Sequence, residues 1–201
     1  MTPSPKQAFY RDEMSKAAVF LDRDGVINRD RPDYVKSWEE FEFLPGVQDA
    51  FRVLALGPRQ IVVVSNQSCI GRGLVSRETV DEIHARMTEA VRRSGGRIDA
   101  VYYCPHRPDE DCPCRKPRPG LILKAALELD IDLAASWMVG DDLKDLETAK
   151  AAGVRPVLVR TGHGRDLPEA RLARVAYPFN VFEDLLDAVT RLDEGRVSSK
   201  S

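Results

Sequence analysis

The stretch AVFLDRDG, residues 18–25, decides the fold of this 201-residue chain. Its four apolar residues form a short uninterrupted run, which is typical of a parallel strand covered by helices on both faces. The acids Asp22 and Asp24 follow at once, two positions apart. Because ligands of open α/β sheets bind beyond the carboxyl ends of the strands, this order of residues predicts a central strand that delivers two carboxylates to a functional site.

Four further apolar runs extend this pattern along the chain. The predicted strands are 18–21, 61–64, 100–103, 137–139 and 156–159. Segments with helical patterns separate the strands, and Asn180 is predicted to cap the last helix. The predicted helices are 47–56, 76–94, 120–129, 143–152 and 181–192. This alternation predicts an α/β fold with a Rossmann-like, doubly wound and mostly parallel sheet, right-handed crossovers and helices on both faces.

Length and charge limit the classes of protein to consider. A chain of this length favours one domain, which we place at residues 16–195 with tails at 1–15 and 196–201. The 30 basic and 32 acidic side chains leave a net charge of -2, which argues against nucleic-acid or membrane partners. No apolar run approaches the roughly 20 residues that cross a bilayer, and the polar N-terminus has no secretion signal. We therefore expect a monomeric protein of the cytoplasm.

Polar side chains follow four of the predicted strands. They are Asp22 and Asp24, then Ser65, Asn66 and Gln67, then Arg115 and Lys116, and finally Asp141 and Asp142. Because the carboxyl ends of parallel strands lie along one edge of a sheet, these side chains are expected to meet there. Any one of these groups alone could be an ordinary turn or capping motif. Their joint occurrence at equivalent strand ends favours a functional site.

These residue types suit phosphoryl transfer. Two close carboxylates repel each other unless a cation lies between them or one of them holds a proton. A carboxylate such as Asp22 or Asp24 can attack phosphorus, and a second, protonated carboxyl group can donate to the leaving oxygen. Asp141 offers the hard oxygen ligand that Mg²⁺ prefers. Ser65 and Lys116 offer a hydroxyl donor and a positive charge to the remaining phosphoryl oxygens.

Four motifs in this order resemble those of the haloacid dehalogenase-like phosphatase superfamily. They are DRDGVIN at 22–28, SNQS at 65–68, RKP at 115–117 and GDDLKD at 140–145. The resemblance extends from about residue 18 to residue 161, which is most of the chain. It implies a Mg²⁺-dependent phosphatase that forms an aspartyl-phosphate intermediate.

The resemblance also implies roles for single residues. Asp22 becomes the nucleophile and Asp24 the general acid and base. Asp22, the backbone carbonyl of Asp24, and Asp141 become the ligands of Mg²⁺. Ser65 and Lys116 become phosphate-binding residues.

Other residues of these motifs receive less specific roles. The resemblance implies that either Asp142 or Asp145 supports the site as a further acid. We expect Asn66 and Gln67 to orient the nucleophile or substrate hydroxyls. Arg115 is expected to contact the substrate.

Three of the four cysteines lie close to a histidine in the sequence. Cys104 and His106 precede Cys112 and Cys114 by five intervening residues, which makes the Cys₃His ligand set of a closed zinc site. A disulfide and free buried thiols are the alternatives, but a disulfide is disfavoured in the cytoplasm and two cysteines one residue apart bridge poorly. With no ligand position left for water, we expect structural Zn²⁺ that orders the loop. Cys69 is predicted to take no part.

The cysteine loop narrows the resemblance. CPH at 104–106, CPCRKP at 112–117 and SNQSCIGRG at 65–73 resemble the heptose 1,7-bisphosphate 7-phosphatase and histidinol-phosphatase family. The resemblance implies a small phosphorylated sugar as substrate, namely D-glycero-D-manno-heptose 1,7-bisphosphate cleaved at its 7-phosphate. Histidinol phosphate is the alternative substrate, and a phospho-aspartate receiver module is the alternative class. Asp142 occupies a position where members of the heptose group can have lysine, which leaves the preferred anomer open.

The spacing of the motifs leaves no room for a separate cap domain. Residues 26–45 suit only a hairpin-like flap, so the protein is predicted to be nearly capless. Trp38 and Trp137 are expected to pack in the flap or the core. His84 lies in a helix of mixed charge and is expected to be solvated.

Overall fold

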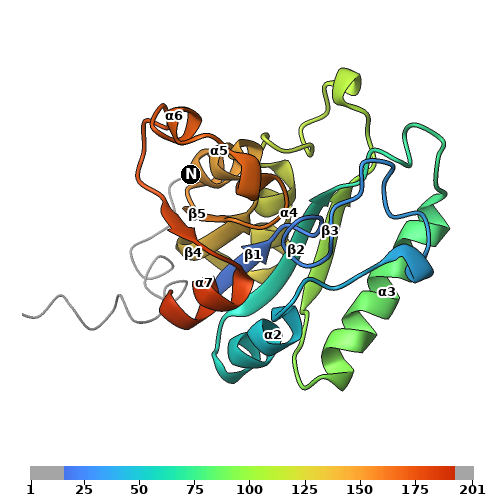
Figure 1. Ribbon diagram of the computed structural model, residues 1–201, viewed down its shortest axis with the longest axis horizontal. Coiled ribbons are helices and arrows are strands. Elements are labelled where there is room, and N and C mark those ends of the chain that lie inside the picture. The colour runs from blue at the N-terminus through green and yellow to red at the C-terminus, as the bar shows by residue number, and fades with distance from the viewer. Residues whose placement is uncertain (1–15, 193–201) are drawn as a thin grey trace, which may run out of the picture.

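Six parallel strands form one sheet in the order β3-β2-β1-β4-β5-β6 (Figure 1). The strands are β1 (Lys16–Leu21), β2 (Gln60–Asn66), β3 (Ala100–Cys104), β4 (Ile131–Gly140), β5 (Arg155–Val159) and β6 (Asn180–Phe182). This computed structural model describes residues 16–192. The predicted tails at 1–15 and 196–201, and the last three residues of the predicted domain, lie outside the described residues. The α/β class and the doubly wound parallel sheet are confirmed.

Most predicted helices begin and end within one residue of the expected positions. The helices are α2 (Val47–Leu56), α3 (Arg77–Arg93), α4 (Gly120–Leu129), α5 (Leu143–Ala152), α6 (Glu169–Leu172) and α7 (Leu185–Arg191). Short 3₁₀ turns are η1 (Trp38–Glu40), η2 (Pro108–Glu110) and η3 (Gly162–Asp166). Ser76 caps α3, since its hydroxyl accepts the Thr79 N–H at 3.1 Å.

One predicted helix start was wrong. Asn180 does not cap a helix; it begins the edge strand β6, which pairs with β5 through Val157 and Asn180. The last helix begins later, where Asp184 accepts the Asp187 N–H at 2.8 Å. A strand of three residues is too short for its alternating pattern to be recognised in the sequence.

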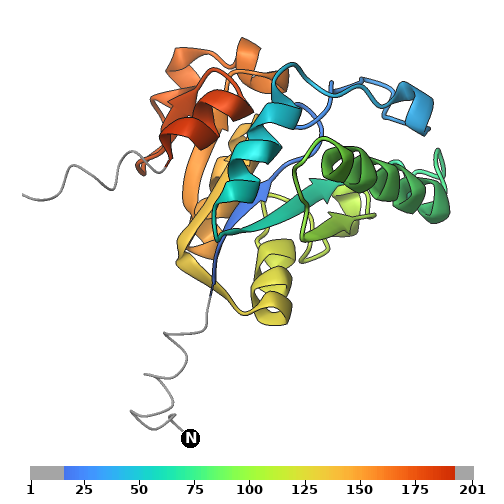
Figure 2. The same ribbon diagram turned by 90° about the horizontal axis from the view of Figure 1, so that it is seen from below.

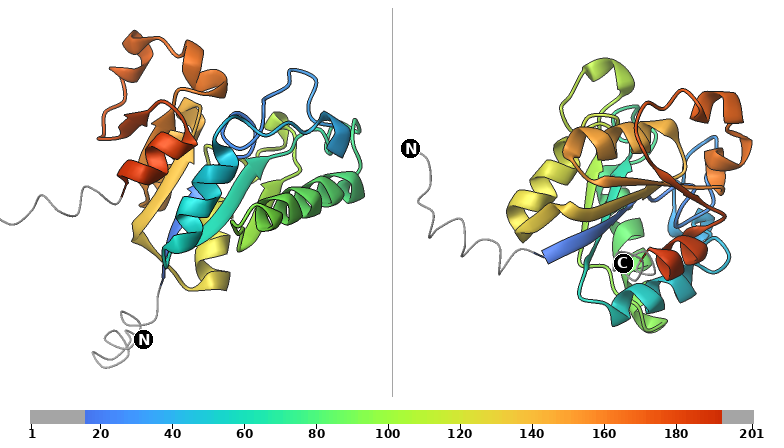
Figure 3. Two further views of the ribbon diagram at one scale, coloured as in Figure 1. Left: turned by 60° about the horizontal axis from the view of Figure 1, so that its bottom comes forward. Right: turned by 90° about the vertical axis from the view of Figure 1, so that its left-hand side faces the viewer.

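Helices cover both faces of the sheet (Figures 2 and 3). Val19 and Leu21 of β1 pack with α2, α3 and α7, whereas Ala18 and Phe20 pack with α4 on the other face, where α5 also lies. This alternation follows from the two-residue period of a strand. The buried apolar runs of the sequence therefore fill two separate cores, as a sheet covered on both faces requires.

The strand order reverses in the middle of the sheet, so a crevice is expected at the carboxyl ends of the central strands. The chain passes from β1 through β2 to β3 on one side and from β4 to β6 on the other, so the strand order reverses beside β1. Residues 26–45 form the predicted flap, and η1 is the one helical turn in it. Trp38 stacks on Phe41 at 5.0 Å between ring centroids, and Phe43 packs edge-on against both rings.

Both tryptophans lie where they were expected. Trp38 belongs to this aromatic cluster of the flap, and Trp137 is buried in β4. Among residues 16–192, no helix combines the length and the apolar character needed to cross a bilayer.

Candidate active site

Asp22 follows β1 directly and faces a buried lysine. The Lys116 ammonium lies 2.7 Å from Asp22 Oδ2 and 2.7 Å from Asp145 Oδ1. All three side chains are almost completely buried. The Asp22 N–H donates to the Val139 carbonyl of β4 at 3.0 Å, so the two central strands fix the position of this carboxylate together. The result is an aspartate in a fixed position with one cation beside it.

A third acid completes the cluster. Carboxylate oxygens of Asp22, Asp141 and Asp145 lie within 4.8 Å of one another. Asp141 Oδ2 accepts the His163 N–H at 2.8 Å, whereas its Oδ1 is buried and has no hydrogen-bond partner among the described residues. Asp145, rather than Asp142, therefore joins this cluster of acids. Asp142 caps α5 and pairs with Lys144 at 2.9 Å.

The charges of this cluster do not balance. Burial raises the pKa of Asp22 to about 6, although Lys116 opposes the shift. Burial, with Asp145 and Asp22 nearby, raises the pKa of Asp141 to about 8. Three carboxyl groups therefore lie in a site of low polarity with one directly paired ammonium, that of Lys116, while the charge of Lys144 has a smaller effect on Asp22 and Asp141. Closely spaced carboxylate oxygens, one of them without a partner, fit a hard divalent cation such as Mg²⁺.

Two glycines allow the backbone to approach these acids. Gly25 has a φ of 82°, and a Cβ atom there would lie 2.0 Å from Asp141 Oδ2. A Cβ atom on Gly140 would lie 2.1 Å from the Cβ atom of Asp145. Neither position can accept a larger residue without displacing an acid of the cluster.

We expect Gly140→Ala to disturb the site through this contact. The added methyl group must push Asp145 away, which should lower the free energy of unfolding by about 1–3 kcal/mol. The displaced Asp145 also releases Lys116, so the rate of catalysis should fall about 10²-fold. Chemical denaturation and steady-state kinetics measure both effects.

Gly57→Ala is the matched control for this change. Gly57 has a φ of -92°, and an added Cβ would meet its nearest neighbour, the Leu54 carbonyl oxygen, at an ordinary 3.6 Å. The control should keep the stability and rate of the unchanged chain. A Gly140→Ala protein that behaves like this control would contradict the steric argument.

Asp24 lies apart from the three-acid cluster. Its Oδ1 accepts from Arg23 Nη2 at 2.8 Å and from Asn28 Nδ2 at 2.9 Å, and its Oδ2 accepts from Gln67 Nε2 at 2.9 Å. Arg23 holds the pKa of Asp24 below its usual value, against the opposing effect of burial. In the substrate-free protein this carboxylate is therefore ionised, the form in which it can accept a proton.

Residues at the end of β2 and directly after it support the site around the lysine. Asn66 Nδ2 donates to the Lys116 carbonyl at 3.1 Å, and its Oδ1 accepts the Lys116 N–H at 3.0 Å. Gln67 donates to Ser65 Oγ at 2.8 Å as well as to Asp24. Asn66 thus holds the lysine backbone and Gln67 holds an acid. In this structure both amides have protein partners, so their predicted contact with the substrate stays a prediction.

The acids open into a cleft of about 300 Å³ beneath the flap. Its lining residues include Asp22, Asp24, Ser65, Asn66, Arg115, Lys144 and His163. Arg115 donates to the His106 carbonyl at 3.3 Å, which ties this cleft residue to the cysteine loop. Ser65 and Arg115 therefore reach the same space as Asp22, as the strand-end argument predicted.

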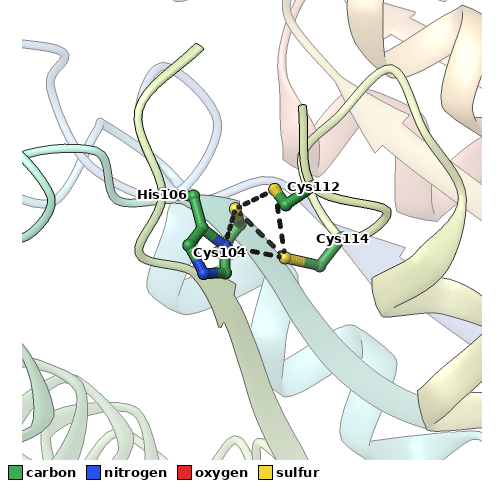
Figure 4. A group of neighbouring side chains, drawn as sticks. All are labelled: Cys104, His106, Cys112 and Cys114. Atoms are coloured by element: carbon green, nitrogen blue, oxygen red, sulfur yellow. Dashed lines mark hydrogen bonds between the residues drawn. The ribbon is translucent and has the colours of Figure 1, made fainter. Parts of the chain in front are cut away.

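The side chains of the cysteine loop come together at the end of β3 and in the segment that follows it (Figure 4); they are Cys104, His106, Cys112 and Cys114. The Cys114 sulfur lies 3.3 Å from the Cys104 sulfur, 3.5 Å from the Cys112 sulfur and 3.3 Å from His106 Nδ1. These separations are too long for a disulfide, whose S–S bond is about 2.05 Å. They are close to the ligand–ligand separations of a tetrahedron around one ion bound at about 2.0–2.3 Å. The loop therefore has the donor set and the spacing of a metal site.

The prediction for His84 was wrong. His84 is buried in α3, and its Nε2 lies 3.1 Å from Nη1 of Arg23, which is itself 1% exposed. The signal was present in the sequence, because His84 falls on the apolar stripe of Val80, Met87 and Val91 at helical spacing. The partner of His84 could not be inferred, since Arg23 lies 61 positions away.

This fold and site define a class of protein. A doubly wound parallel sheet with an aspartate after its first strand, a lysine and further acids at the same edge is the architecture of a haloacid dehalogenase-like hydrolase. A HAD-hydrolase-like family model matches residues 113–188.

Individual relatives specify the family further. The chain is 39% identical to a D-glycero-beta-D-manno-heptose-1,7-bisphosphate 7-phosphatase of Pseudomonas aeruginosa over 89% of this chain and 99% of that protein. It is 42% identical to the enzyme of the same name from Escherichia coli over 88% and 95%. A crystal structure of D,D-heptose 1,7-bisphosphate phosphatase from Bordetella bronchiseptica, complexed with magnesium and phosphate, superposes with a TM-score of 0.82 at 41% identity, covering 89% and 99%. The chain belongs to the heptose 1,7-bisphosphate 7-phosphatase family of haloacid dehalogenase-like phosphatases.

Proposed function

We propose that this chain removes the 7-phosphate of D-glycero-β-D-manno-heptose 1,7-bisphosphate through an aspartyl-phosphate on Asp22. The observation that carries the proposal is the contact of Asp22 with Lys116, 2.7 Å apart beside the cleft. The names of the relatives support the substrate and its β anomer. The residue roles are those that the motif resemblance implies, and the contacts of Asp22, Lys116 and Asp24 support them.

The first step forms the phosphoenzyme. Asp22 attacks phosphorus, the bond to O7 of the sugar breaks, and the phosphoryl group passes to a carboxylate oxygen of Asp22. Lys116 neutralises charge on the transferring oxygens, and the Ser65 hydroxyl donates to one of them. Asp145 and Asn66 keep Lys116 in place for this role.

Asp24 handles the proton in both steps. The approach of an anionic phosphate raises the pKa of Asp24, which favours uptake of a proton from solvent. Asp24 then donates this proton to O7 as the sugar departs, which avoids the release of an alkoxide. In the second step the ionised Asp24 accepts a proton from a water molecule whose oxygen bonds to phosphorus. The bond between phosphorus and the Asp22 oxygen breaks, which returns Asp22 as a carboxylate and releases inorganic phosphate.

Two metal ions complete the proposal. Asp22, Asp141 and the backbone carbonyl of Asp24 would hold Mg²⁺, which would supply positive charge to the phosphoryl oxygens. Cys104, His106, Cys112 and Cys114 would hold structural Zn²⁺.

Substrate comparison tests the proposal. Rates measured with the β and α heptose 1,7-bisphosphates and with histidinol phosphate should give the highest kcat/KM for the β heptose. A clear preference for histidinol phosphate would assign the chain to the other substrate of this group. Release of less than one phosphate per chain, with lasting phosphorylation, would instead favour a receiver-type module.

A further inference from the structure

A buried arginine connects Asp24 to α3, a helix of which no residue lines the cleft. Arg23 is 1% exposed, and its guanidinium group donates to Asp24 Oδ1 from Nε at 3.2 Å and from Nη2 at 2.8 Å. Its Nη1 faces the Nε2 atom of His84 in α3 at 3.1 Å. Asp24 thus touches one side of a fixed cation, and His84 touches the other.

The chemistry of arginine defines the state of this histidine. A guanidinium group carries only donors, so His84 Nε2 must accept, and its proton must reside on Nδ1. Burial and the charge of Arg23 agree with this, because they lower the pKa of His84 to about 3. The imidazole is therefore neutral across the physiological range. Asp24 exerts the opposite, smaller effect on this pKa.

His84 has little freedom to move away from Arg23. Its ring packs against Tyr103 of β3 with 5.2 Å between centroids, and it lies on the buried stripe of α3. Among residues 16–192, its Nδ1 atom has no hydrogen-bond partner. Among the described residues, the His84 ring therefore makes its polar contact with Arg23 through Nε2. This contact fixes one end of the guanidinium group.

We propose that His84 is a positioning residue for Asp24, which acts by holding the Arg23 guanidinium at the angle that presents the Asp24 carboxyl group to the leaving oxygen. This inference rests on the acid and base role of Asp24 proposed above. His84 touches neither the substrate space nor the three-acid cluster. Without an acceptor at this position, a buried N–H of Arg23 loses its partner, which drives the guanidinium group and Asp24 to rearrange.

Two substitutions separate positioning from simple packing. His84→Leu fills a similar volume but offers no acceptor, whereas His84→Gln retains an acceptor oxygen. With the heptose bisphosphate, we expect His84→Leu to lower kcat about 10-fold or more at nearly unchanged KM, since general acid catalysis contributes about 10²–10⁴-fold. His84→Gln should restore most of that rate.

A comparison of substrates with different leaving groups distinguishes a positioning role from a packing defect, because a packing defect would lower both rates equally. Aryl phosphates release a stabilised phenolate that needs little help from a general acid. The rate with p-nitrophenyl phosphate should therefore fall much less in His84→Leu than the rate with the sugar substrate. Equal losses with both substrates, unchanged rates, or failure of His84→Gln to restore the rate would overturn the inference.

Crystal structures of both variants test the inference without a measurement of activity. The Asp24 carboxylate should be displaced in His84→Leu and unmoved in His84→Gln. An unmoved Asp24 in His84→Leu would overturn the inference even if the rate with the sugar substrate falls. Absence of phosphate release by the unchanged chain would refute the proposed function instead, so the two failures remain distinguishable.

Discussion

Asp22→Asn should lower the rate of phosphate release at least about 10⁴-fold, because an amide cannot form the phosphoenzyme. The fold should survive the change. Burial already disfavours the ionised form of Asp22, and Lys116 keeps Asp145 as its partner. We therefore expect an unfolding temperature no lower than that of the unchanged chain. Steady-state kinetics and a thermal melt measure the two effects.

Acid quenching separates the nucleophile from a residue that only binds. Substrate labelled in the 7-phosphate should leave label on the unchanged chain after rapid quenching and none on Asp22→Asn. Asp142→Asn is the matched control, because Asp142 pairs with Lys144 and asparagine caps a helix as well as aspartate does. The control should remain active. Appreciable turnover by Asp22→Asn would rule out Asp22 as the nucleophile.

Loss of the cysteine cluster should have the second large effect. The protein purified without added zinc should contain close to one zinc ion per chain, and Cys114→Ser should lose it. Structural zinc contributes about 10–16 kcal/mol to the ordering of small sites, so the loop should lose its defined structure. Arg115 and Lys116 follow Cys114 directly. Their displacement by about 1 Å should lower kcat/KM about 10²-fold.

Cys69→Ser is the control for the loss of a buried thiol. Cys69 is fully buried but lies outside the cluster, and its sulfur contacts Gln67 Oε1 at 3.7 Å. A hydroxyl can make the same contact, so this variant should keep its zinc and its rate. Elemental analysis measures the zinc content of Cys114→Ser and Cys69→Ser, and steady-state kinetics measures their kcat/KM. A fully active protein without zinc would contradict a structural role for the metal.

Local features of the sequence were sufficient for most of the fold. The central strands are short apolar runs that any chain of this pattern must bury, and α2, α4 and α5 end where their helical patterns end. The strand β6 was mistaken for a helix start, because three residues at a sheet edge depend on pairing with β5 rather than on their own propensity. The meeting of Asp22, Lys116 and Asp141 was predictable, since parallel strands bring their carboxyl ends to one edge.

Side-chain direction could not be read from the order of residues. In the sequence, Asp142 and Asp145 are equally good candidates for the supporting acid. In the structure Asp142 is the N-cap of α5, whereas Asp145 lies three positions later and pairs with Lys116. Asp24 shares its motif with Asp22 but turns to Arg23 and Gln67. Acids that are close in the sequence thus have different partners in the structure.

The amino-acid sequence therefore specifies which polar side chains reach the site, because strand periodicity and sheet topology place them at one edge of the sheet. Packing between distant segments specifies how those groups are held. His84 was expected in solvent and is instead buried against Arg23, 61 positions away. Such a contact is set by the way α3 lies on the sheet, since two residues so far apart in the chain become neighbours only when the sheet and its helices have come together.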